Sequence, residues 1–148
     1  MDSRKAVCFV SEENICRSII AEVYLRKLAK QYFEVQSFGF SPDRVHFLVS
    51  KVLKDRGLRP DYSFSKSYDV ISRQRFDYFV LMEPGLKDKM PAIPYEHEMV
   101  VWDVEKLDLD AFEDENEAIQ ALNELCDKIE SKVKEFVTKY KPTGVPVG

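Results

Sequence analysis

Val10-Ser11-Glu12-Glu13-Asn14-Ile15-Cys16-Arg17-Ser18 is the stretch that decides the fold of this chain. It joins a short apolar run, residues 5–10, to a helical pattern that begins near residue 18. A strand that passes through a short loop into a helix N-terminus forms an anion site, because unpaired backbone N–H groups converge there and the helix dipole favours negative charge. Arg17 adds a planar fork of donors suited to phosphate or another tetrahedral oxyanion. We therefore predict a phosphate-binding loop made of Ser11, Glu12, Glu13, Asn14, Ile15, Cys16, Arg17 and Ser18.

The composition is typical of one soluble globular domain. A chain of 148 residues that is 45% hydrophobic and 32% charged is long enough to bury a core and has ordinary surface polarity. The net charge is −4 without a basic stripe, so we expect no nucleic-acid partner. No apolar run approaches a membrane span, and residues 1–5 leave no room for a signal peptide before the first strand. We therefore expect no membrane partner and a cytoplasmic location.

The cysteines and histidines give no sign of a disulfide framework or a metal site. Three cysteines, widely spread, suit a reducing cytoplasm, and Cys8 and Cys126 lie on apolar patterns as expected of core residues. The two histidines, His46 and His97, are far apart and fit surface or helix-capping roles. We predict no metal and no cofactor.

Strand and helix patterns alternate along the chain. Strands are predicted at residues 6–10, 33–38, 78–82 and 99–102, and the main helices at residues 18–31, 41–57 and 112–140. This alternation predicts an α/β fold, a single-domain three-layer sandwich with a four-stranded parallel sheet and helices on both faces. Ligands of such sheets bind beyond the carboxyl ends of the strands, where the loop after the first strand lies. We place the domain at residues 1–140 and expect a flexible C-terminal tail at residues 141–148.

Two helices carry specific expectations. In the first, apolar residues recur at helical spacing, at Ile20, Val23, Tyr24 and Leu28. This pattern places Glu22 on the outside. The second helix is expected to take Ser41 or Asp43 as its N-terminal cap and to end at Gly57 in a left-handed conformation.

The loop resembles the phosphate-binding loop of the low-molecular-weight protein tyrosine phosphatases and of the arsenate reductases that share their fold. That family has a nucleophilic cysteine, five residues and Arg-Ser, commonly written Asn-Ile-Cys-Arg-Ser before a helix that carries an Ala-Glu pair. Residues 14–18 and Ala21-Glu22 match as they stand, and the Glu13-Asn14 pair is similar to the arsenate reductase version. The resemblance implies phosphotyrosine hydrolysis through a cysteinyl-phosphate intermediate, and a ligand that is phosphate or contains phosphotyrosine.

The nucleophile of the resembling family falls on Ser11. The family chemistry depends on a thiolate, whose pKa a helix N-terminus can lower, whereas a serine hydroxyl needs an adjacent base or a metal. The local sequence offers no histidine. We expect the loop to keep its oxyanion affinity and to lose nearly all turnover.

The general acid of the family, the aspartate of an Asp-Pro pair late in the chain, also has no direct match. The corresponding region, residues 102–110, contains Asp103, Asp108 and Asp110 without a following proline. We favour Asp103 slightly because it follows a strand end directly. The predicted catalytic set is therefore Ser11, Arg17 and Asp103.

Three interpretations remain open. Ser11 is an engineered replacement that traps a ligand in a phosphatase-like enzyme, or it is native and the protein is a pseudoenzyme, a pseudophosphatase that binds an oxyanionic partner. The third is an arsenate reductase relative that uses thiol redox chemistry. The missing Asp-Pro pair favours the second over the first, because nucleophile and acid depart together. The third ranks last, since Cys8 and Cys126 are poorly placed as resolving thiols. The sequence leaves the oligomeric state open.

Overall fold

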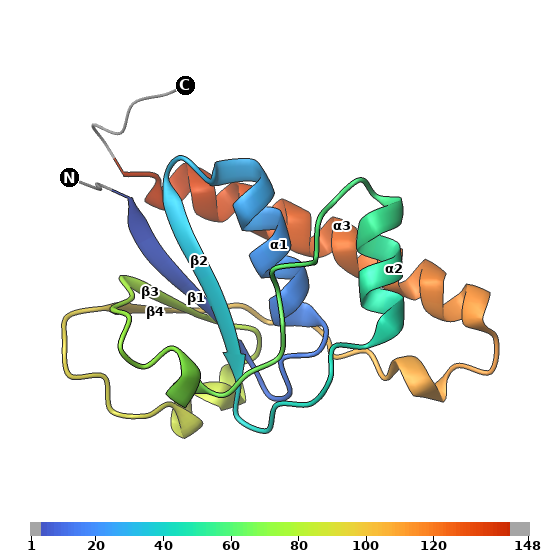
Figure 1. The fold of residues 1–148 in the computed structure, drawn as a ribbon, viewed down its shortest axis with the longest axis horizontal. Helices are drawn as coiled ribbons and strands as arrows, with labels where there is room; N and C mark the ends of the chain where they lie inside the picture. The colour runs from blue at the N-terminus through green and yellow to red at the C-terminus, as the bar shows by residue number, and fades with distance from the viewer. Residues whose placement is uncertain (1–3, 143–148) are drawn as a thin grey trace.

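The computed structural model describes residues 4–142, which build a four-stranded parallel sheet with helices packed against it (Figure 1). The strands are β1 (Lys5–Ser11), β2 (Phe33–Gly39), β3 (Tyr78–Leu81) and β4 (Glu98–Val101), in the order β2-β1-β3-β4. The α-helices are α1 (Arg17–Ala29), α2 (Phe47–Asp55) and α3 (Glu115–Tyr140). Short 3-10 helices are η1 (Tyr68–Val70), η2 (Pro84–Lys89) and η3 (Leu109–Ala111). The predicted α/β fold around a four-stranded parallel sheet is confirmed.

The two faces of the sheet are covered differently. The three α-helices gather on one side, where they share a core with strand residues such as Val7, Phe9 and Val80 (Figure 1). The other side, which includes Cys8 and Phe79, is covered by η1, η2 and their connecting segments. Successive residues of a strand point to opposite faces, so β1 supplies both cores and reads as a nearly continuous apolar run.

The helix α2 begins later than the sequence predicts. Its cap is His46 rather than Ser41 or Asp43, and the imidazole Nδ1 of His46 accepts the N–H of Leu48 at 3.2 Å. The residues before the cap stay extended because their N–H groups donate to carbonyls of the loop after β1. The predicted end of the helix is confirmed, since Gly57 has φ +78°.

The predicted exposure of Glu22 is wrong, because this residue of α1 is 0% exposed. Ser37 Oγ donates to its carboxylate at 2.6 Å, Arg26 donates at 2.7 Å, and Ser63 Oγ also donates to it. A buried carboxylate is tolerated when such charge-assisted bonds replace its hydration. The helix α1 can therefore lie buried on nearly all sides.

Two predictions concern the ends of the chain and the membrane. Of the tail expected at residues 141–148, the structure describes only residues 141 and 142, so this prediction lies almost entirely outside the described residues. Within residues 4–142, no helix has the length and apolar character needed to cross a membrane.

The sheet topology places the loop of residues 12–16 at a favourable position for a ligand. The strand β1 is central, with β2 on one side and β3 on the other. All four strands are parallel, so their carboxyl ends meet at one edge of the sheet. The loop leaves β1 at that edge, at the point where the strand order reverses, which is the usual ligand position in open α/β sheets.

Gly39 ends β2 and lies directly against this loop. A Cβ atom built on Gly39 would lie 2.7 Å from the backbone N of Asn14 and 2.8 Å from the carbonyl carbon of Glu13. Both are backbone atoms that cannot rotate away. The absence of a side chain at Gly39 therefore lets the loop pass close to the sheet.

The substitution Gly39→Ala is expected to lower the free energy of unfolding by about 1–3 kcal/mol, because the methyl group overpacks the loop backbone. Urea unfolding followed by circular dichroism measures this change. The matched control is Gly85→Ala, where a Cβ atom would meet nothing within 4 Å. Equal stability losses in the two variants would contradict the close contact.

Candidate oxyanion site

The carbonyl groups of the loop bond to the segment that follows β2. Ser41 N–H donates to Glu12 O at 2.8 Å, Asp43 N–H to Glu13 O at 3.1 Å, and His46 N–H to Ile15 O at 3.4 Å. Within residues 4–142, the N–H groups of Glu13, Ile15, Cys16 and Arg17 find no protein acceptor. These donors stand at the N-terminus of α1, where the helix dipole favours an anion.

Asn14 holds the shape of the loop. Its backbone has φ +56°, a left-handed conformation that asparagine tolerates better than most residues, and its side chain is buried. The side-chain Nδ2 donates to Ser18 Oγ at 2.8 Å and to Ser37 Oγ at 3.0 Å, while Oδ1 accepts Lys66 N–H at 3.0 Å. One side chain thus joins α1, β2 and the segment before η1.

Ser11 is buried at the end of β1, and its hydroxyl belongs to the same network. Its Oγ lies 2.6 Å from Ser18 Oγ and accepts the backbone N–H of Asn14 at 3.0 Å. Ser18 contacts residue 11 in this way and does not cap α1, since the capping position is Cys16. Among the described residues, no carboxylate, imidazole or amine bonds to Ser11 Oγ. The site therefore holds a hydroxyl without a base.

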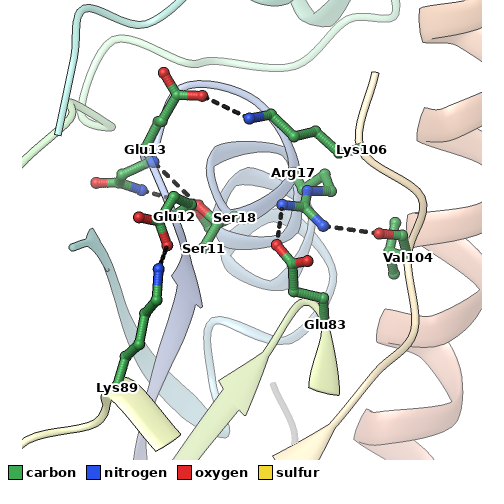
Figure 2. A network of polar contacts seen from close by, with 10 residues as sticks. Ser11, Glu12, Glu13, Arg17, Ser18, Glu83, Lys89, Val104 and Lys106 are labelled. Carbon is green, nitrogen blue, oxygen red and sulfur yellow. Dashed lines mark hydrogen bonds and ion pairs between the residues drawn. The ribbon is translucent and has the colours of Figure 1, made fainter. Parts of the chain in front are cut away.

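The two acids of the loop are each paired with a lysine (Figure 2). Glu12 bonds to Lys89 Nζ at 2.8 Å, and Glu13 bonds to Lys106 Nζ at 2.8 Å. The hydrogen bond that Lys106 donates to the Glu13 carboxylate raises the pKa of Lys106. The lysines follow β3 and β4 respectively, and no spacing in the sequence indicated either contact.

Arg17 is buried, and its fork is already engaged (Figure 2). Nη1 donates to Val104 O at 2.8 Å and Nη2 donates to the Glu83 carboxylate at 2.8 Å. Glu83 and Val104 come from the segments after β3 and β4, so Arg17 ties the N-terminus of α1 to both. An oxyanion in the loop would compete with Glu83 for this guanidinium.

Two cavities adjoin the loop. The smaller, of about 20 Å³, is lined by residues 11–17 with Lys106 and Leu107 and has room for about one water molecule. The larger, of about 450 Å³, shares Lys106 and Leu107 with it and also includes Asp108 and Asp110. Asp103 is exposed and lines neither cavity. The structure thus brings Ser11 and Arg17 together and leaves Asp103 apart from them.

The three cysteines are free and buried, which confirms Cys8 and Cys126 as core residues. Burial raises the pKa of Cys16 to about 12 and that of Cys126 to about 11, and it also raises the pKa of Cys8. Among the residues that the structure describes, no group of three or more potential ligands could hold a metal ion. The thiol within the candidate site, that of Cys16, is therefore a neutral group at physiological pH.

Comparison with known proteins gives a consistent picture. A family model described as low molecular weight phosphotyrosine protein phosphatase matches residues 6–143. Among solved structures, a thioredoxin-dependent arsenate reductase of Corynebacterium glutamicum has 28% identity and a TM-score of 0.70 over 92% of this chain, which spans only 61% of that protein.

Two further structures show the same fold at lower identity. A low molecular weight protein tyrosine phosphatase from T. tengcongensis has 19% identity and a TM-score of 0.73, with 92% of this chain and 99% of that chain covered. The tyrosine phosphatase Wzb from Escherichia coli K30, in complex with sulphate, has 19% identity and a TM-score of 0.70, with 92% and 98% covered. A comparison with curated proteins found no match.

The substitutions Asn14→Ala and Asn14→Gly separate the two roles of Asn14. Both remove the side-chain bonds and are expected to lower the free energy of unfolding by about 2 kcal/mol or more, because buried partners lose hydrogen bonds. Only alanine also opposes the left-handed backbone, so Asn14→Ala should be less stable than Asn14→Gly by about 1 kcal/mol. Urea unfolding measures both values. An alanine variant as stable as the glycine variant would show that the backbone does not constrain this position.

Proposed function

Since the chain belongs to the low molecular weight phosphotyrosine protein phosphatase family, we propose that its loop from Ser11 to Ser18 binds phosphate or a similar oxyanion. One observation carries this proposal. The carbonyl groups of the loop bond to the segment after β2, which leaves backbone N–H groups at the start of α1 available to a ligand. Two relatives support it, an arsenate reductase described in a phosphate-binding state and the phosphatase Wzb in complex with sulphate.

The second part of the proposal is that the protein binds its ligand with little or no hydrolysis. Ser11 occupies the nucleophile position, and within residues 4–142 its hydroxyl bonds only to Ser18 and Asn14, neither of which can remove its proton. Cys16 cannot replace it, because a thiol with a pKa of about 12 supplies almost no thiolate. A phosphorylated partner would therefore be bound and retained.

Ligand entry requires local adjustment. The small cavity has room for about one water molecule, and a tetrahedral oxyanion is larger, so Lys106 and Leu107 must move to admit it. Arg17 donates to Glu83, so an oxyanion in the loop would compete with this carboxylate for the guanidinium, whose remaining N–H groups are available to the ligand. We propose phosphate or a phosphotyrosine-containing partner as this ligand, bound by a native pseudoenzyme or by a trapping variant.

If a cysteine at position 11 restored catalysis, a general acid would also be needed, and we propose three candidates for it. Asp103 follows β4 directly but is exposed and outside both cavities. Asp108 and Asp110 line the larger cavity, and Asp110 bonds to His46 Nε2 at 2.8 Å. Position therefore favours Asp108 and Asp110 over Asp103 for proton donation to a ligand in the loop.

The alternative function is that of an arsenate reductase relative, which the Glu13-Asn14 pair and the similarity to the corynebacterial reductase favour. Thiol redox chemistry requires an accessible thiolate and a resolving cysteine. All three cysteines are buried and their pKa values are raised. The burial of the thiols thus supports oxyanion binding in preference to redox turnover. The free state of the three cysteines also supports a cytoplasmic location.

Thiol titration tests the redox alternative. At pH 8 a pKa of about 12 leaves about one part in ten thousand of Cys16 as thiolate, so the folded protein should react very slowly with Ellman's reagent. In guanidinium chloride all three cysteines should react within minutes. A thiol of the folded protein that reacts as fast as free cysteine would favour the reductase.

Hydrolysis of p-nitrophenyl phosphate by the chain and by Ser11→Cys tests the proposed function. The parent should show no turnover above background, and the variant should gain turnover of roughly a hundredfold or more over background, because a thiolate at the helix N-terminus is a strong nucleophile. Phosphate binding, titrated by calorimetry, should occur in both.

The control is Ser11→Cys combined with Cys16→Ser, which keeps the new thiol and removes its neighbour. Its turnover should equal that of Ser11→Cys. Phosphate binding without turnover in any variant would identify a dedicated binding module. Absence of phosphate binding in both the parent and Ser11→Cys would overturn the proposed function.

A further inference from the structure

A separate cavity of about 430 Å³ lies beside the second half of α1. Its lining consists of Val23, Arg26, Lys27 and Lys30 from α1 and its end, with Gly57, Arg59 and Tyr62 from the segment after α2. It shares no residue with the cavities at the loop. The helix rises about 1.5 Å per residue, so Lys30 lies roughly 20 Å along the axis from the N-terminus of α1.

The charge of this cavity is opposite to that of the whole chain. Among the residues that the structure describes, four cationic side chains line it and no carboxylate does, although the chain has a net charge of −4. Within residues 4–142, Lys27, Lys30 and Arg59 have no ion-pair partner. A concave site lined by one sign of charge concentrates the potential and attracts the opposite sign.

Arg26 differs from the other three cations because it is fixed in place. Its Nη2 bonds to the buried carboxylate of Glu22 at 2.7 Å, and its Nη1 bonds to Ser63 Oγ at 3.1 Å. A guanidinium has five N–H donors, so these bonds leave others for a ligand. A fixed donor loses little conformational freedom on binding.

Tyr62 and Gly57 complete the walls of the cavity. Tyr62 is 69% exposed, so its ring offers a face to an aromatic or sugar ring. Gly57 has no side chain, and a Cβ atom built there would meet nothing within 4 Å, which leaves that side open. The volume falls in the range of small-molecule pockets, about 300–1,000 Å³.

We propose that this basic cavity binds a small molecule that carries a chain of phosphates, either a nucleoside triphosphate or an inorganic polyphosphate. Lys27 and Lys30 are three residues apart at the end of α1, and Arg59 comes from the segment after α2, so the cations are supplied by two separate parts of the chain. A single phosphate cannot neutralise all of these charges, whereas a phosphate chain can contact each wall. The concave arrangement favours a small molecule over the flat surface of an anionic membrane.

Calorimetric titration of the full chain with tripolyphosphate, ATP and orthophosphate tests the proposal. Tripolyphosphate should bind at least about tenfold more tightly than orthophosphate, and its affinity should fall as sodium chloride is raised, since salt screens exposed charges. The double variant Lys27→Glu/Arg59→Glu should weaken tripolyphosphate binding by roughly tenfold or more, because it reverses two charges of the cavity. Both residues are exposed, so the fold should be retained.

The matched control is Lys87→Glu/Lys128→Glu, which makes the same change in net charge at exposed positions outside the cavity. Its tripolyphosphate affinity should stay within about twofold of the parent. Orthophosphate binding at the loop should be the same in both double variants, which separates this site from the proposed oxyanion site.

The variant Tyr62→Ala distinguishes the two sources of the phosphate chain. Weaker binding of ATP alone identifies a nucleotide ligand that uses the ring, and equal binding of both probes identifies a polyphosphate ligand. The proposal is overturned if both double variants lose affinity equally, if tripolyphosphate binds no better than orthophosphate, or if only vesicles of anionic lipid bind.

Discussion

The left-handed backbone of Asn14 is the constraint on which the site depends. It reverses the chain between β1 and α1, and the buried amide then bonds to Ser18, to Ser37 and to the N–H of Lys66. These contacts join parts of the chain that are distant in sequence. The loop carbonyls bond to the segment after β2, whereas the N–H groups of Glu13, Ile15, Cys16 and Arg17 keep no protein acceptor within residues 4–142. The proposed anion site is thus a consequence of where the loop's own carbonyls are satisfied.

The network continues from the loop to a buried charge. Ser37 bonds to both Asn14 and Glu22, and Glu22 also accepts bonds from Ser63 and Arg26. A fully satisfied buried network rigidifies its surroundings, whereas removal of one member leaves several polar groups without partners. The chain of bonds reaches from the loop to Arg26 in the wall of the basic cavity. The loop geometry and that cavity therefore rest on one polar core.

Local patterns could predict the strands and the loop, because apolar runs and the spacing in residues 14–18 are read directly from neighbouring residues. The start of α2 could not be predicted in this way, since Ser41 and Asp43 give their N–H groups to a loop far back in the chain. The burial of Glu22 depends on Ser37 and Ser63, which no helical periodicity includes. Arg17 and the loop acids contact the segments after β3 and β4. These contacts could not be predicted either, because they depend on the order of the strands in the sheet.

Charge balance explains how a loop proposed to bind an anion can contain two acids. Three ion pairs surround it, Glu12 with Lys89, Glu13 with Lys106 and Glu83 with Arg17, so three carboxylates offset three cations. Surface ion pairs contribute little stability on their own, but here they remove net repulsion toward an incoming anion. The attraction that remains comes from backbone N–H groups and the dipole of α1, which act over a short range. The proposed site is therefore expected to select its ligand by the shape of the oxyanion, because the balanced charges provide little long-range attraction.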